Sequence, residues 1–180
     1  EWTQRIHQRK GQQIMVCPGS RWENKRFSKP TLIEFLKEIS NSKKVFFYFL
    51  WGTEEERKES LEFFKEFPKN SLSMEKVSIP LLQHLMSLMD QIISVDSFAL
   101  HLSALTTTPA FAVFGPSQAS RYLPPKVNTG TFQGTCIYDE EFTTRCSKLR
   151  KCPTGACMKL LTSQQLFDSY SIFSSKIQSE

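Results

Sequence analysis

Hydrophobic residues along this chain follow two different patterns. Short continuous apolar runs, such as Val45–Trp51 and Ala110–Phe114, are typical of strands that are buried on both faces of a sheet. Elsewhere the apolar residues recur every three or four positions, as Leu32, Leu36 and Ile39 do, which is typical of one face of a helix. The two patterns alternate along the chain, and together they predict an α/β protein.

Turn residues and helix-starting prolines set the bounds of these elements. Strands are predicted at Gln13–Cys17, Val45–Trp51, Gln91–Val95 and Ala110–Phe114, with weaker ones near Met74–Val77 and Thr135–Tyr138. Helices are predicted at Pro30–Ile39, Glu54–Phe67, Ile79–Met89, Ser97–Leu105 and Ser163–Ile177. Strands that alternate with helices in this way form a parallel sheet with right-handed crossovers, so we expect helices on both of its faces.

The same pattern divides the chain into three parts. Residues 1–13 are polar and basic, and we expect a linker or the end of an upstream segment there. Residues 14–162 form the α/β domain, within which residues 121–157 make an irregular loop rich in Pro, Gly, Thr and Cys. Residues 163–180 form a C-terminal helix, whose apolar stripe we expect to be exposed.

Composition and charge exclude several classes of protein. A length of 180 residues fits one domain, and 39% hydrophobic with 23% charged residues is ordinary for a soluble globular protein. The net charge of +5 is spread along the chain, without the basic clusters of a nucleic-acid-binding protein. The sequence has no membrane-spanning apolar run, no signal-peptide core and an odd number of cysteines, which favours a cytoplasmic protein without a disulfide framework.

Small and polar residues follow four of the predicted strands. They are Pro18-Gly19-Ser20, Trp51-Gly52-Thr53-Glu54, Asp96-Ser97 and Gly115-Pro116-Ser117. In a parallel sheet these four ends lie along one edge, which is where α/β proteins bind ligands. The sequence therefore predicts a single ligand cleft.

Gly19, Ser20 and Lys25 suit a phosphate ligand, because backbone amides, a hydroxyl and a lysine all bind phosphate oxygens. One such turn on its own is more simply an ordinary tight turn after a strand. Four turns on one edge, together with a lysine, favour a phosphate-bearing ligand. Taken alone, His101 is more simply a helix histidine with satisfied hydrogen bonds, and Trp51 is more simply a core residue than a platform for a base.

The glutamates Glu54–Glu56 begin a helix directly after a strand. One of them either accepts hydrogen bonds from the hydroxyls of a ribose or only complements the positive end of the helix dipole.

The late cysteines allow two interpretations, a zinc site or packed thiols. They are Cys136, Cys146, Cys152 and Cys157. Four thiolates are able to hold zinc, but none of these pairs has the short Cys-x2-Cys spacing of structural sites, so we expect packed, reduced thiols.

The order and spacing of these motifs resemble the family 9 glycosyltransferases, which are the ADP-heptose:lipopolysaccharide heptosyltransferases. The motifs are Pro18–Phe27, Trp51-Gly52 followed by Glu54–Glu56, Val95-Asp96-Ser97 followed by His101-Leu102, and Phe114–Ser117. The resemblance covers nearly the whole chain and implies the Rossmann-like, nucleotide-sugar-binding half of an enzyme of the two-domain GT-B type. In that family an amino-terminal domain binds the lipid A–core acceptor and supplies the catalytic aspartate.

The resemblance also implies a role for each motif. Ser20, Lys25 and Ser97 would contact the donor phosphates, and Asp96 would face the hydroxyls of the transferred sugar. For the other residues it implies that Glu56 or Glu55 holds the ribose, that Trp51 lies at the base, and that Gly19, His101 and Gly115 support the turns. One departure is Phe98, which stands where the family usually has glycine and brings a bulky side chain to the site.

What the resemblance implies as a whole is one half of an inverting, metal-independent glycosyltransferase that uses ADP-heptose as its donor and needs no cofactor. It would act at the cytoplasmic face of the inner membrane, with its catalytic base in an amino-terminal domain outside these residues. Two alternatives stay open. Phe98 is compatible with an inactive Rossmann-like domain that binds a nucleotide or a partner protein, and the late cysteines are compatible with a metal-bound interaction module.

Overall fold

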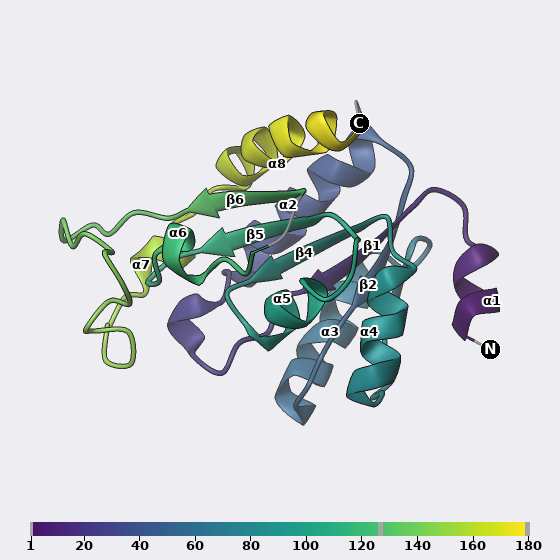
Figure 1. The fold of residues 1–180 in the computed structure, drawn as a ribbon, viewed down its shortest axis with the longest axis horizontal. Coiled ribbons are helices and arrows are strands. Elements are labelled where there is room, and N and C mark those ends of the chain that lie inside the picture. The colour runs from purple at the N-terminus through teal and green to yellow at the C-terminus, as the bar shows by residue number, and fades with distance from the viewer. Residues whose placement is uncertain (1, 126–127, 179–180) are drawn as a thin grey trace.

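A six-stranded parallel sheet forms the centre of the computed structural model, which describes residues 2–125 and 128–178 (Figure 1). The strands are β1 (Gln12–Cys17), β2 (Val45–Phe49), β3 (Ser71–Ser73), β4 (Gln91–Val95), β5 (Ala110–Phe114) and β6 (Thr129–Gln133). Their order across the sheet is β3-β2-β1-β4-β5-β6, and each neighbouring pair is parallel. The predicted α/β class is therefore confirmed, and the strand order reverses between β1 and β4.

Helices cover both faces of this sheet. They are α1 (Trp2–His7), α2 (Lys29–Ser42), α3 (Glu54–Glu66), α4 (Ile79–Ser87), α5 (Phe98–Ser103), α6 (Ala119–Tyr122), α7 (Ala156–Lys159) and α8 (Ser163–Gln178), with a short 3-10 helix η1 (Glu23–Lys25). Buried side chains of α2, α3, α7 and α8 pack on one face, and those of α1, α4 and α5 pack on the other. The ribbon shows helices on both sides of the sheet (Figure 1). None of the helices in the described ranges is long and apolar enough to cross a bilayer.

Local sequence explains where the two longest helices that flank the first strands begin. Ser28 caps α2, because its hydroxyl accepts a hydrogen bond from the amide of Thr31 at 3.2 Å, and Pro30 occupies the first turn. Thr53 caps α3 in a reciprocal capping box with Glu56. α3 therefore starts within a few residues of the end of β2, whereas α2 follows β1 only after the loop that contains η1 (Glu23–Lys25).

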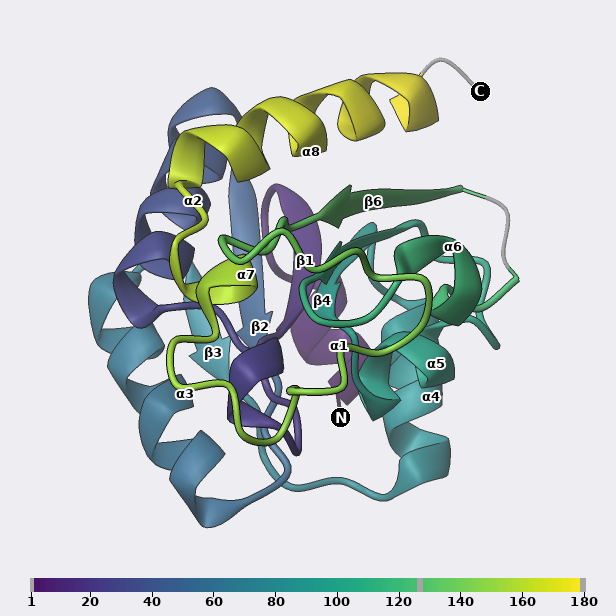
Figure 2. The ribbon, with the colours of Figure 1, turned by 90° about the vertical axis from the view of Figure 1, so that its left-hand side faces the viewer.

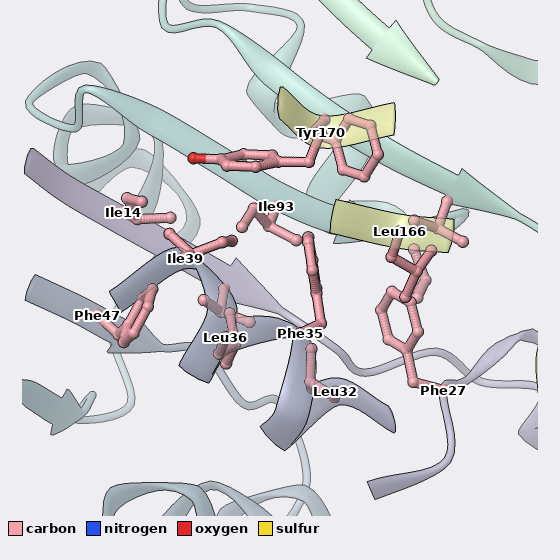
Figure 3. Close-up of a cluster of buried hydrophobic side chains, with 14 of the residues drawn as sticks. Ile14, Phe27, Leu32, Phe35, Leu36, Ile39, Phe47, Ile93, Leu166 and Tyr170 are labelled. Carbon is pink, nitrogen blue, oxygen red and sulfur yellow. The ribbon is translucent and has the colours of Figure 1, made fainter. Parts of the chain in front are cut away.

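Aromatic side chains join α2 and α8 to the sheet. The ring centroid of Tyr170 in α8 lies 5.7 Å from that of Phe35 in α2 and 5.5 Å from that of Phe111 in β5. Figure 3 shows Tyr170 and Leu166 over the residues of α2. Because Leu166 and Tyr170 are at most 1% exposed, the expectation of an exposed apolar stripe on the last helix was wrong. The stripe packs on the core of this same domain.

The two weak strands lie a few residues before their predicted positions. β3 is Ser71–Ser73 rather than Met74–Val77, because Met74 is a buried residue just past the strand. β6 is Thr129–Gln133 rather than Thr135–Tyr138, because this edge strand is polar and only half-buried. At the other end of the chain, the segment expected to be a linker contains α1, whose Ile6 is buried against the sheet.

Candidate functional site

A cleft of about 480 Å³ opens at the carboxyl edge of the sheet. It is lined by the turns that follow β1, β2, β3 and β4, and Figure 2 looks toward this side of the molecule. The cleft lies at the point between β1 and β4 where the strand order reverses, which is the usual ligand site of open α/β sheets. Of the residues predicted to form a site, those lining it are Gly19, Ser20, Lys25, Trp51, Glu56, Asp96, Ser97 and His101.

A buried ion pair joins the turn after β1 to the turn after β4. Lys25 in η1 donates from Nζ to Oδ2 of Asp96, and the two side chains are only 7% and 6% exposed. The hydroxyl of Ser20 reaches the backbone oxygen of Asp96 at 3.5 Å. Two predicted roles, phosphate binding by Lys25 and sugar binding by Asp96, thus fall on side chains that neutralise each other.

Glu56 joins the turns after β1 and β2. Its Oε2 accepts hydrogen bonds from the amides of Gly52 at 2.8 Å and Thr53 at 3.3 Å, and its Oε1 accepts one from Arg26 at 3.1 Å. Gly19 leaves room for this carboxylate, since a Cβ atom there would lie only 2.5 Å from Oε1. The carboxylate is therefore held in one orientation at the cleft wall.

Glu55 and Trp51 differ in how they meet the cleft. The side chain of Glu55 is exposed and does not line it, so the geometry distinguishes Glu55 from Glu56. Trp51 lines the cleft, and its indole N–H donates to the backbone oxygen of Met74. This hydrogen bond fixes the plane of the ring beside the cleft.

The turn after β4 brings an apolar side chain to the cleft mouth. Phe98, at the first position of α5, lines the cleft and is 60% exposed. Ser97 and His101 line the cleft beside it, and the hydroxyl of Ser97 is 3.5 Å from that of Ser94. The bulky residue noted in the sequence is therefore part of the site wall.

The turn after β5 does not reach the cleft. Gly115 lies against α7, and a Cβ atom there would meet Cγ of Met158 at 2.3 Å. Ser117 is buried, and its hydroxyl has no hydrogen-bond partner among the described residues. The fourth predicted turn thus serves the packing of the irregular loop rather than the cleft surface.

Three further cations line the cleft that the sequence analysis did not assign to the site. Arg21 lies in the turn after β1, Lys76 follows β3, and Arg145 comes from the long loop between β6 and α7. Arg21 follows the predicted Gly-Ser turn directly, so its position was a usable signal. Lys76 and Arg145 have no motif around them, and only the fold brings them to the cleft.

Four late cysteines gather around a second, much smaller cavity. Cys136, Cys146, Cys152 and Cys157 all line it. Burial, reinforced by the other three thiols, raises the pKa of Cys157 to about 11, whereas hydrogen bonds from the amides of Gly155 and Thr154 lower the pKa of Cys152. Within the described ranges no three His, Cys, Asp or Glu side chains are placed to hold one metal ion.

Comparison with known proteins places the chain in a family. Residues 2–150 match the sequence model of glycosyltransferase family 9 (heptosyltransferase). The chain belongs to glycosyltransferase family 9. The matched range includes every turn that lines the cleft and also Arg145. No curated protein sequence matches the chain.

The fold of this family 9 chain is similar to half of several solved heptosyltransferases. Escherichia coli WaaC with ADP has 15% identity and a TM-score of 0.71, covering 91% of this chain and 44% of WaaC. E. coli ADP-heptose lipopolysaccharide heptosyltransferase II has 14% identity and a TM-score of 0.71, covering 98% and 51%. E. coli TibC, described as dodecameric and iron-containing and bound to ADP-D-β-D-heptose, has 12% identity and a TM-score of 0.63, covering 96% and 48%. The chain therefore spans about half the length of each, with the fold of one GT-B half.

Proposed function

We propose that this chain is the donor-binding half of an inverting glycosyltransferase that transfers heptose from ADP-heptose to the lipopolysaccharide inner core. One observation carries the proposal: the turns after β1, β2 and β4 bring Ser20, Lys25, Glu56 and Asp96 around a single cleft where the strand order reverses. Family membership and the ADP and ADP-heptose named for the solved relatives support the same donor.

In this proposal Ser20, Lys25 and Ser97 bind the donor diphosphate, and Asp96 binds hydroxyls of the transferred sugar. Glu56 accepts hydrogen bonds from the ribose, since its carboxylate is already oriented at the cleft wall while Glu55 is turned to solvent. The other assignments are that Trp51 lies beside the base and that Gly19, His101 and Gly115 support the surrounding turns.

The chemistry is displacement of the diphosphate at the anomeric carbon by an acceptor hydroxyl. This half positions the donor and stabilises the negative charge that develops on the leaving diphosphate. We propose that cations of the chain fill this role without a metal ion, because Arg21, Lys25, Lys76 and Arg145 all line the cleft. The lipid A–core acceptor and the catalytic base would meet this half through an amino-terminal domain at the cytoplasmic face of the inner membrane.

Titration calorimetry with ADP tests the proposal. We expect weak but measurable binding to the chain, and we expect Lys25→Ala to weaken it by at least about tenfold, because a charge-assisted contact to phosphate is lost. Lys29→Ala is the matched control, since Lys29 is an exposed lysine that pairs with Glu62 away from the cleft. The absence of ADP binding to the unaltered chain at millimolar concentration would count against the proposal.

Phe98 favours a second candidate, an inactive domain that binds another nucleotide or a protein. The side chain stands in the cleft wall, at a position where the family resemblance implies glycine. If the site is an active donor site that Phe98 only narrows, Phe98→Gly should tighten ADP binding severalfold in the same titration. If the domain has lost donor binding, ADP affinity should stay unmeasurable in both proteins, and the second candidate would then be preferred.

A further inference from the structure

The cation predicted to bind phosphate is already neutralised in this cleft. Lys25 is paired with Asp96 inside the protein, and Arg26, its neighbour in the chain, donates to Glu56 and to the backbone oxygen of Ser20. A diphosphate group needs positive charge that no carboxylate already satisfies. Further positive charge, beyond that of Lys25, must therefore come from other cations of the cleft.

Three cations that line the cleft form no ion pair with any described residue: Arg21, Lys76 and Arg145. Of these we single out Arg145, because the turn after β5 holds its backbone in place. Its side chain lines the cleft and is exposed. The guanidinium carbon lies 4.5 Å from the ring centroid of Tyr122, and this stacking limits the conformations of the side chain. Among the described residues its N–H groups have no hydrogen-bond partner. A planar guanidinium also matches a phosphate with two parallel hydrogen bonds, which a lysine does not.

The backbone around Arg145 is held in place by the turn after β5. Arg145 forms an antiparallel bridge with Ser117. On either side of it, the amide of Gln118 donates to the oxygen of Thr144 at 2.9 Å and the amide of Cys146 donates to the oxygen of Pro116 at 2.7 Å. These hydrogen bonds tie the long loop, which Figure 2 shows passing in front of the sheet, to the end of β5. The fourth predicted turn thus acts on the cleft indirectly, by positioning Arg145.

We propose that Arg145 binds the diphosphate of the nucleotide donor. This inference rests on the proposed function, because it names a further ligand-binding residue of the same site. The charge of Lys25 is then shared between Asp96 and the diphosphate, while Arg145 adds positive charge that no described carboxylate satisfies. The donor site is complete only when the loop between β6 and α7 is packed on the end of β5.

The test compares ligands with and without phosphate. Arg145→Ala should weaken ADP and inorganic pyrophosphate binding by at least about tenfold, and adenosine binding should change by less than about twofold. The ADP affinity of Arg145→Lys should lie between those of the unaltered chain and Arg145→Ala, because lysine keeps the positive charge but cannot form the two parallel hydrogen bonds of a guanidinium. Arg150→Ala is the matched control: Arg150 is in the same loop and stacks on Trp22 at the same 4.5 Å, but it does not line the cleft.

The outcomes distinguish a failure of this inference from a failure of the proposed function. If the unaltered chain binds ADP and Arg145→Ala binds it equally well, the inference is overturned and the proposed function stands. An equal loss for adenosine and ADP would also overturn it, because Arg145 would then act only on the structure. If the chain binds pyrophosphate through Arg145 but gains no affinity from the nucleoside, the diphosphate-binding role of Arg145 is kept and the proposed nucleotide donor fails. If it binds neither ligand, both fail.

Discussion

Replacing Lys25 with methionine should lower the free energy of unfolding by about 3–5 kcal/mol, measured by urea denaturation. The reason is the environment of its partner. Asp96 is 5% exposed, and the carboxylate would remain buried without the ammonium group that faces it. Asp96→Asn should be costly for the converse reason, because it leaves the lysine buried without an opposite charge.

The double variant Lys25→Met/Asp96→Asn separates charge pairing from packing. Because it removes both charges together, we expect it to be more stable than either single variant. It should nevertheless bind ADP less tightly than the unaltered chain, since the cleft loses two proposed donor contacts. If the three variants were equally destabilised, or if the double variant showed the sum of the two single losses, the buried pair would not be the cause.

Features that depend on neighbouring residues could be predicted from the sequence, whereas features that depend on contacts between distant residues could not. The buried strands β2, β4 and β5 were found because continuous apolar runs are a local signal. The parallel order then brought the first three polar turns to one cleft, as the topology of an α/β sheet requires. The edge strand β6 was misplaced, because its alternation of Thr and Gly with Phe132 carries almost no apolar signal.

The charges of the cleft were less accessible to sequence reasoning. Lys25 and Asp96 are 71 positions apart, and no local pattern shows that they pair rather than bind two different parts of a ligand. Arg145 is further still from the first turn and belongs to a loop without periodicity. Its place is decided by backbone hydrogen bonds to the turn after β5, and such tertiary contacts leave no trace in spacing or composition.

The second large loss of stability is expected for a substitution in α8. Tyr170→Ala should lower the free energy of unfolding by about 3–5 kcal/mol, because it removes a buried ring that contacts Phe35 and Phe111 and leaves a cavity between α2, α8 and the sheet. Tyr170→Phe keeps the ring but removes the hydroxyl that donates to Oε1 of Gln91. We expect a smaller loss of about 1–3 kcal/mol for it, since a buried acceptor is left without its donor.

Ile172→Ala is the control for this helix, since its side chain is 62% exposed two positions away, and its unfolding energy should change by no more than about 0.5 kcal/mol. The comparison distinguishes two views of the last helix. If α8 belongs to the core of this domain, the cost follows burial and falls on Tyr170. A comparable loss at Ile172, or an unchanged midpoint for Tyr170→Ala, would mean that the helix is stabilised by its outer face, which the packing against α2 and β6 argues against.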